Sequence, residues 1–344
     1  MTPSASASAS PASGPAGPEP APPAPAPPGT ARPPFDRLPR LPGSGLPHAW
    51  DVYGPDDESG TVNLLDGPTV AAALARPRSG RRIALSLPVT LPDPPLFKRR
   101  PVRHEVFPTG RNTWDDRLDG LYLQASSQWD SLRHVRARED GFYGGWQGDP
   151  DQHPTRLGIQ NWASGIVGRG VLVDIAAELA DEPGYDPFDR FRIETDHLKA
   201  ALARQGTELV PGDILCLRTG WMDRYLAMDT DDRTAHARLY EDVDSRRWAG
   251  LSGGEDMSRY LWDSGVSAVV ADNPAVEYSP GEPWLGSLHR RLIPCLGFAL
   301  GELFTLGELA AACRAAGAYD FLFVAVPLNL PGGVGSPANA MAVV

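Results

Sequence analysis

The 344-residue chain is poor in cysteine, in net positive charge and in long apolar runs. Its three cysteines, Cys216, Cys295 and Cys313, have spacings that form neither a C-x-x-C pair nor a zinc knuckle. We expect them to be buried thiols in a reducing compartment. No stretch approaches the ~20 apolar residues of a membrane-spanning helix, and the start of the chain lacks the basic and apolar regions of a secretory signal. These features predict a cytoplasmic protein with no membrane partner.

The charge balance is acidic, with 32 Lys and Arg against 43 Asp and Glu, a net charge of −11 and a pI near 5.1. A broad basic surface is therefore not expected, which argues against nucleic acid as a partner. At 36.9 kDa and 42% hydrophobic residues, the chain is long enough to bury a sizeable core. The expected partner is a small-molecule substrate.

Residues 1–34 form a separate block of Ala, Ser, Pro and Gly whose only charges are Glu19 and Arg32. Such a segment buries too little surface to offset the entropy of ordering it. We therefore expect a disordered tail over 1–34 and a folded domain over 35–344.

The rest of the chain alternates strand-like and helical patterns, which predicts a single α/β domain. Asp66 is a candidate helix cap, and Gly206 is a candidate helix end. The glycine-rich stretch 330–337 is expected to be irregular and to line a pocket with its backbone. The expected strands cover 82–89, 170–175, 213–219, 266–271, 296–304 and 321–326, and the expected helices cover 68–75, 195–205, 256–263 and 305–317, the last with a capping box at 305–308.

Polar donors concentrate in residues 122–134, where Gln124, Gln128 and Asp130 precede His134. In an extended strand, alternate side chains share a face, so the two glutamines and Asp130 would lie together, with Trp129 on the other face. His134 follows closely enough to join the polar face as a ligand or proton acceptor. Glu302 ends a mostly apolar run, where an ionised carboxylate is costly unless a cation or hydrogen-bond donors meet it.

The run 127–134, S-Q-W-D-S-L-R-H, resembles the H-x-G-T-H-x-D-x-P-x-H signature of the metal-dependent cyclase family, which includes bacterial kynurenine formamidases and isatin hydrolases. Asp130 and His134 match that signature, whereas glutamine stands at the two leading histidine positions. His289 and Glu302 fit the histidine and glutamate that the family supplies later in the chain. Further matching segments (50–65, 212–221, 261–274 and 327–339) resemble a longer Q-W-D branch of the family.

The resemblance implies the family's swivelling β/β/α fold, a homo-oligomer, and metal ligands at Gln128, Asp130, His289 and Glu302. Amide oxygens in place of imidazoles make such a site harder, which favours Mn²⁺ or Mg²⁺, with Zn²⁺ as a further candidate. His134 would act as the general base in hydrolysis, or in ring closure, at an amide, lactone or ester bond of a small cyclic or aryl substrate. Metal-free cyclisation or isomerisation and non-catalytic binding of a small molecule remain as alternatives.

Three residues are expected to contact the substrate, namely Gln124, Trp129 and Asp272. Asp272 directly follows the expected strand 266–271, and polar residues beyond a buried strand end often contact ligands. Trp129 offers an aromatic wall, although a core tryptophan would look the same in sequence. The segment 250–254 matches G-x-S-x-G, but the charged residues before it favour a flexible loop over a serine nucleophile.

Overall fold

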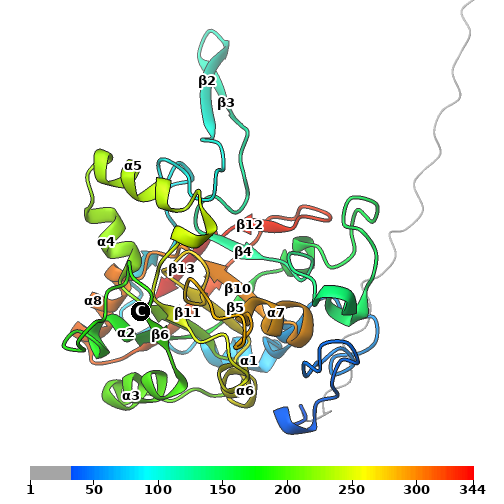
Figure 1. Cartoon of the computed structure of the whole chain (residues 1–344). Helices are drawn as coiled ribbons and strands as arrows, with labels where there is room; N and C mark the ends of the chain where they lie inside the picture. The colour runs from blue at the N-terminus through cyan, green and yellow to red at the C-terminus, as the bar shows by residue number, and fades with distance from the viewer. Residues whose placement is uncertain (1–31) are drawn as a thin grey trace, which may run out of the picture. The chain divides into compact units, whose positions relative to one another are not determined.

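A computed structural model describes residues 32–344 of the chain, so most of the predicted tail lies outside the described residues. The central feature is one mixed nine-stranded sheet with the order β1-β13-β11-β5-β7-β9-β10-β4-β12 (Figure 1). Its inner strands β5, β7, β9 and β10 are parallel, and antiparallel strands flank them on both sides. The strands are β1 (Arg82–Ala84), β4 (Gln128–Asp130), β5 (Ile166–Asp174), β7 (Ile214–Arg218), β9 (Ala268–Ala271), β10 (Ala299–Glu302), β11 (Asp320–Ala325), β12 (Gly335–Pro337) and β13 (Ala340–Val343).

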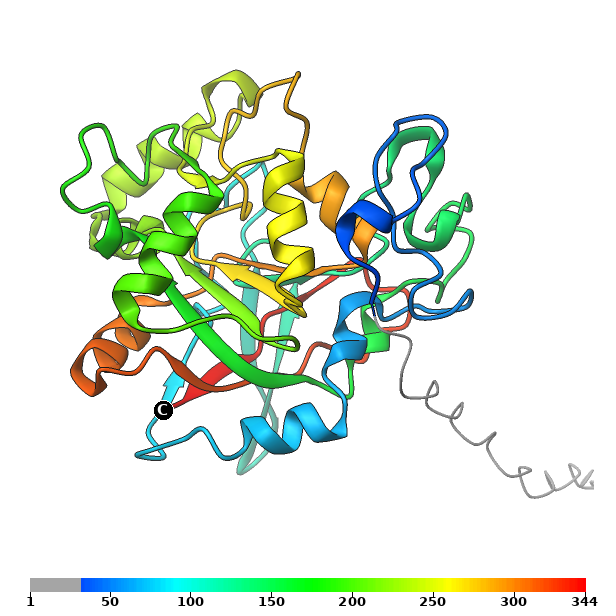
Figure 2. The same ribbon diagram turned by 90° about the horizontal axis from the view of Figure 1, so that it is seen from below.

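The sequences of β7 and β9 are nearly continuous apolar runs, which is typical of parallel strands that are covered on both faces. Every residue of β9 and β10 is buried, and in β7 only the last is partly exposed. Figure 2 shows α3 and α6 on one side of the sheet and α1 on the other. The α/β prediction is therefore confirmed. The helices are α1 (Gly67–Ala73), α2 (Ile175–Glu178), α3 (Thr195–Gln205), α4 (Trp221–Ala227), α5 (Thr230–Leu239), α6 (Glu255–Asp263), α7 (Leu288–Arg290) and α8 (Gly307–Ala316).

Two predicted helix ends agree with the structure, whereas Thr195, expected as a cap, lies inside α3, whose N-cap is Glu194. Asp66 caps α1 by accepting a hydrogen bond from the Thr69 backbone N–H, and Gly206 ends α3 in the left-handed conformation. The three cysteines are buried and free, as expected. Within 32–344, no helix is both long and apolar enough to cross a bilayer.

Three local predictions were wrong in extent. Residues 122–134 form a strand only over β4, and the expected strand 82–89 shortens to β1. The glycine-rich stretch 330–337 is not wholly irregular, because β12 pairs with β4 and places Gly335 opposite Asp130. A Cβ at Gly335 would lie 2.8 Å from the Trp129 carbonyl oxygen and 2.9 Å from Gln124 Cγ. Only glycine therefore lets these two strands approach so closely beside Gln124.

Strands β2 (Arg103–Gly110) and β3 (Thr113–Asp119) form a hairpin that projects from the body of the molecule (Figure 1). Residues directly opposite each other share a face, so the hairpin has a charged face and a more apolar one. Arg117 pairs with Glu105 and Asp119 on the charged face. The other face exposes Val106, Trp114 and Leu118 at 57%, 66% and 43%. A separate parallel pair joins β6 (Arg192–Ile193), which precedes α3, to β8 (Gly250–Leu251), which precedes α6.

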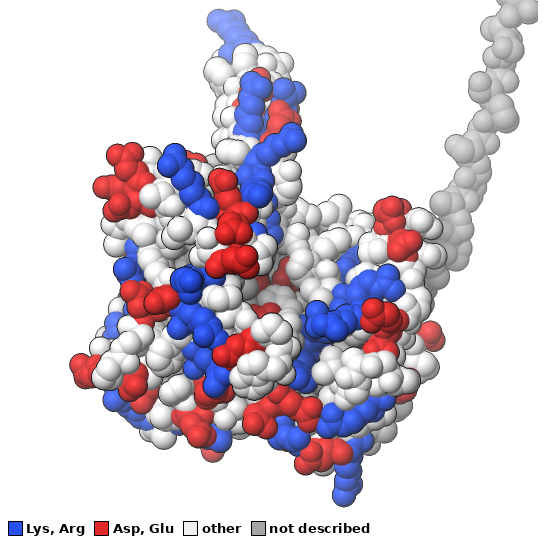
Figure 3. Space-filling view, viewed as in Figure 1, with Lys and Arg blue, Asp and Glu red and all other residues white. Residues whose placement is uncertain are grey.

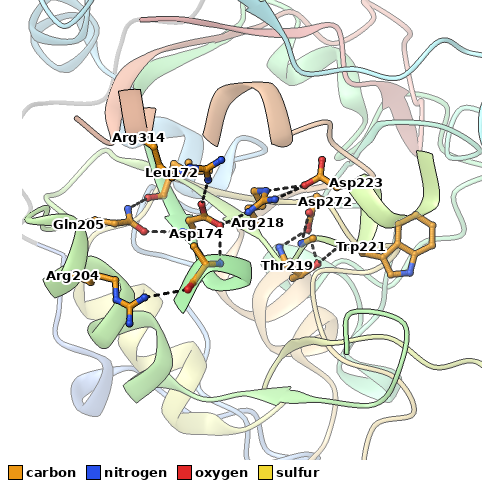
Figure 4. A network of polar contacts seen from close by, with 12 residues as sticks. Leu172, Asp174, Arg204, Gln205, Arg218, Thr219, Trp221, Asp223, Asp272 and Arg314 are labelled. Atoms are coloured by element: carbon orange, nitrogen blue, oxygen red, sulfur yellow. Dashed lines mark hydrogen bonds and ion pairs between the residues drawn. The ribbon is translucent and has the colours of Figure 1, made fainter. Parts of the chain in front are cut away.

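A polar network ties together the carboxyl ends of β5 and β7 (Figure 4). Arg218 donates to Asp174 at 2.6 Å and to Asp223 at 2.6 Å, and Arg314 of α8 donates to the second Asp174 oxygen at 2.9 Å. Burial lowers the pKa of Arg218, but the two carboxylates outweigh it and raise that pKa. The network fixes neighbouring strand ends to each other and to a covering helix.

Candidate metal and substrate site

Strand β4 directs its alternate side chains to two different environments. Gln128 lies directly opposite Glu302 of β10, and its Nε2 donates to Glu302 Oε2 at 2.5 Å. Asp130, two residues on, shares this face. All three side chains are buried.

His289 reaches the same place from α7. Ser287 caps this short helix by accepting from the Arg290 backbone N–H, and buried Leu288 anchors it. The imidazole lies between two carboxylates, with Nδ1 2.8 Å from Glu277 Oε1 and Nε2 2.9 Å from Glu302 Oε1. A histidine that ligates a metal commonly has its other ring nitrogen fixed by a carboxylate in this way.

Asp130, His289 and Glu302 each offer one ligand atom, and these atoms lie within 4.8 Å of one another. Two buried oxygens at this place, Gln128 Oε1 and Asp130 Oδ2, have no hydrogen-bond partner within the described residues. A buried carboxylate oxygen without a partner is costly, and a cation would remove that cost. The donor set of two carboxylates, one imidazole and one amide oxygen therefore fits a divalent cation.

The electrostatics of the cluster show the same need for a counter-charge. Burial raises the pKa of Glu302, and the nearby charge of Asp130 raises it further. Burial lowers the pKa of His289, but its hydrogen bonds to Glu277 and Glu302 outweigh burial and hold that pKa well above the ordinary value. Glu277 shows the reciprocal effect, since burial raises its pKa but the bond from His289 brings it below the ordinary value. The protein thus partly neutralises these crowded carboxylates with a shared proton on His289.

Gln124 and His134 lie beside Asp130, at the more open side of the cluster. Gln124 is in a turn before β4, and its Nε2 lies 3.1 Å from Asp130 Oδ1 and 3.0 Å from His134 Nδ1. As the donor to both, the amide makes Nδ1 an acceptor, so the neutral ring carries its hydrogen on Nε2. That nitrogen lies 3.8 Å from Asp130 Oδ2, and the ring is 32% exposed. His134 can therefore exchange a proton with solvent while facing the cluster.

Trp129 does not lie on this face. Its side chain is fully buried, its indole N–H donates to the Ala338 carbonyl at 3.0 Å, and its ring packs edge-on against Phe304 and Phe323. The expected substrate contact is wrong for this residue, because strand alternation points it into the core. Trp129 is instead a residue of the hydrophobic core.

Asp272 is also buried, and it accepts hydrogen bonds from the loop that follows β7 (Figure 4). One of its oxygens accepts from Thr219 N–H at 2.7 Å and from Thr219 Oγ1 at 2.6 Å, and the other accepts from Gly220 N–H at 2.8 Å. With 1% exposure, the carboxylate has no surface to offer a substrate, which corrects its expected role. Burial raises its pKa to about 6.

The structure gathers the remaining predicted site residues in one place, and their roles as ligands and catalyst stay predictions. They are Gln124, Gln128, Asp130, His134, His289 and Glu302.

Sequence reasoning missed Glu277 and Arg99. Glu277 follows β9 at the end of an N-P-A-V-E run that carries no motif, and only the fold brings it to His289. Arg99 belongs to a basic run, K-R-R, whose other members are exposed, and it donates to the Gln124 backbone carbonyl. No local signal distinguishes either residue from a surface charge.

The G-x-S-x-G segment is not the flexible loop that we expected. Ser252 is buried between β8 and α6, so the segment does have a strand before it and a helix after it. The Ser252 hydroxyl contacts only the Gly254 N–H, and among the described residues it has no histidine or carboxylate partner. Without a base, the serine is not an activated nucleophile.

The α/β fold thus brings Asp130 of β4, Glu302 of β10 and His289 of α7 to one place that could hold a metal ion, and comparison with known proteins identifies the family. The family described as "Putative cyclase" matches residues 83–278. A crystal structure described as a novel cyclase is 31% identical, with a TM-score of 0.73, and covers 86% of this chain and 99% of that chain. The chain therefore belongs to the cyclase family.

More distant structures share the fold. An isatin hydrolase bound to the product analogue thioisatinate is 18% identical, with a TM-score of 0.54, over 77% of this chain and 92% of that chain. Isatin hydrolase A from Ralstonia solanacearum is 18% identical, with a TM-score of 0.55, over 80% and 95%. No curated protein gives a significant match. The fold is thus that of the cyclases and isatin hydrolases over most of the chain, whereas membership of a longer Q-W-D branch stays a prediction.

Proposed function

We propose that the protein is a metal-dependent hydrolase or cyclase that acts on an amide, lactone or ester bond of a small cyclic or aryl substrate. The observation that carries the proposal is the convergence of Asp130, His289 and Glu302 around two buried oxygens that lack a partner. The isatin hydrolases with the same fold support the choice of a small cyclic substrate.

Gln128, Asp130, His289 and Glu302 would hold the cation, with Mn²⁺ or Mg²⁺ favoured by the oxygen-rich set and Zn²⁺ as a third candidate. Such a cation, when bound, supplies polarisation of a substrate carbonyl and acidification of water. Glu277 keeps His289 oriented through the 2.8 Å contact with Nδ1.

His134 would move the proton in the reaction. As a general base it would take a proton from water, and as an acid it would protonate the leaving group. The acid role requires the imidazolium form, and the base role requires a free ring nitrogen, which the Gln124 amide provides at Nε2 when it turns its oxygen toward Nδ1 and so places the hydrogen of the neutral ring on Nδ1. The exposed edge of the ring then lets solvent reset its protonation.

The test is metal content and turnover together. Elemental mass spectrometry should find about one Mn, Mg or Zn per chain in protein purified without chelators. The metal should be lost in Asp130→Ala and kept in Asp196→Ala, which alters a carboxylate that is 89% exposed. His134→Ala should keep the metal and lose about 10²- to 10⁴-fold in turnover on a panel of small amides and lactones. No metal in the wild type after reconstitution would overturn the proposal and favour metal-free catalysis or ligand binding.

We also propose a homo-oligomer in the cytoplasm. An isolated hairpin is marginally stable in water, and the exposed Val106, Trp114 and Leu118 face of β2–β3 supports packing against a second copy of the chain. The three free, buried thiols support a reducing compartment.

A further inference from the structure

Two arginines near the candidate site, Arg99 and Arg246, have no carboxylate within ion-pair distance in the part of the chain that the structure describes. Both guanidinium groups lie over the Phe97 ring, with their carbon atoms 5.2 Å and 5.0 Å from its centroid. Arg246 also donates from Nε to the Tyr240 carbonyl at 3.0 Å. These contacts hold the two side chains in place but leave their charge uncompensated.

Arg99 is linked directly to the cluster. It donates to the backbone carbonyl of Gln124, whose side chain contacts both Asp130 and His134. Burial lowers the pKa of Arg99, the charges of Glu302 and Asp130 raise it, and Arg246 opposes them. The Arg99 guanidinium therefore interacts electrostatically with Glu302 and Asp130, although it forms an ion pair with neither. Figure 3 shows a hollow in the middle of the visible face, with acidic atoms inside it and both basic and acidic side chains around it.

The charge balance changes when a divalent cation is present. Asp130, Glu277 and Glu302 contribute three negative charges, which a divalent cation and one arginine would neutralise. The second arginine then leaves an excess positive charge in a partly buried place, where a charge is expensive to leave unpaired. An anion supplied by the substrate would remove that cost.

We propose that Arg99 and Arg246 recognise a carboxylate on the substrate or product, so that the enzyme selects singly charged aryl carboxylates over neutral analogues. This inference rests on the proposed function. A guanidinium binds a carboxylate through two parallel hydrogen bonds, which gives orientation as well as affinity. The aromatic part of such a ligand would lie against Phe97, which packs edge-on to Tyr240 and Trp248.

Equilibrium dialysis of the metal-loaded protein against benzoate or benzamide tests the idea without turnover. These probes have the same ring and differ in charge. The wild type should bind benzoate at least about tenfold more tightly, a difference of about 1.4 kcal/mol. That preference should disappear in Arg99→Gln and in Arg246→Gln. It should persist in Arg247→Gln, which alters an exposed neighbour, and it should return in part in Arg99→Lys, which restores the charge.

Each outcome decides the proposal. Equal binding of benzoate and benzamide by the wild type would overturn it. A benzoate preference that survives both glutamine variants would also overturn it, since the cation alone would then account for anion binding. Because the readout is affinity, loss of the preference in folded variants supports the arginine site even if no hydrolysis is ever found, and the failure of the two proposals can be told apart.

Discussion

Glu277→Gln tests whether His289 is a ligand that a carboxylate orients. Glu277 accepts from His289 Nδ1 at 2.8 Å, from Leu288 N–H at 2.6 Å and from the Ser287 hydroxyl at 3.0 Å. Glutamine keeps the size of the side chain and one acceptor oxygen, but it removes the charge and turns a donor toward groups that donate. His289 would then lose the partner that fixes its orientation.

The expected cost follows from that loss. Partners that orient metal-ligating histidines contribute about 10- to 100-fold in metal affinity, which corresponds to about 1.4–2.7 kcal/mol. Burial of Glu277 and its three donors place it at the strong end of such contacts, so we expect a loss near the upper value.

The assay is competition for Mn²⁺ between the protein and a fluorescent chelator. Glu308→Gln is the matched control, because Glu308 is 61% exposed and pairs with Arg81 at the surface. Thermal unfolding of the metal-free proteins separates weaker binding from a lost fold. Unchanged Mn²⁺ affinity in folded Glu277→Gln would refute the role given to the Glu277–His289 pair.

Three further predictions concern stability and assembly. The pKa of Asp272 is about 6 in the folded protein against an ordinary value of 3.8, so its protonated carboxyl group stabilises the fold fully below about pH 4, and this stabilisation is lost as the pH rises through 6. In urea unfolding, the free energy of unfolding of the wild type relative to Asp272→Asn should therefore fall by about 3 kcal/mol over that pH range. Arg218→Met should destabilise by about 1.5–3 kcal/mol at neutral pH, because buried Asp174 loses one charged hydrogen bond and keeps only Arg314 as a cationic partner, and a change below about 0.5 kcal/mol would contradict this account. Trp114→Ser should shift the molar mass measured by light scattering toward the monomer, while Trp284→Ser, which alters a similarly exposed tryptophan outside the hairpin, should not; identical masses for wild type and Trp114→Ser would remove the hairpin from the interface.

The parts of the fold that sequence predicts well are those set by local physical chemistry. The buried strands β7, β9 and β11 are continuous apolar runs, and a carboxylate cap or a left-handed glycine marks the ends of α1 and α3. These signals need no knowledge of distant residues. The lengths of β1 and β4 cannot be predicted from local sequence, because they depend on the strands that pair with them, β13 and β10.

The candidate site likewise combines residues that local sequence groups together and residues that only the fold brings near them. Gln128, Asp130 and His134 are close in sequence, so their grouping follows from one strand and one turn. His289 lies in a basic run, L-H-R-R, of a kind typical of a solvated helix face, yet it lies inside the protein, where Glu277 and Glu302 contact its two ring nitrogens. Glu277 and Arg99 arrive through tertiary contacts alone. The prediction for Asp272 was wrong because this polar side chain beyond the end of β9 accepts hydrogen bonds from Thr219 and Gly220, which follow the neighbouring strand β7.

The alternation of side chains in β4 limits which sequence changes can alter the chemistry of the site without disturbing the core. Trp129 packs in the core between two residues that face the cluster, so one inserted or deleted residue would exchange the faces, burying a carboxylate in apolar surroundings and placing an indole among the acids. Substitutions at positions 128 and 130 keep Trp129 in the core, whereas an insertion or deletion within β4 moves it out. Engineered libraries that seek a new activity in this chain should therefore vary residue identity in β4 and confine insertions to the turns on either side of it.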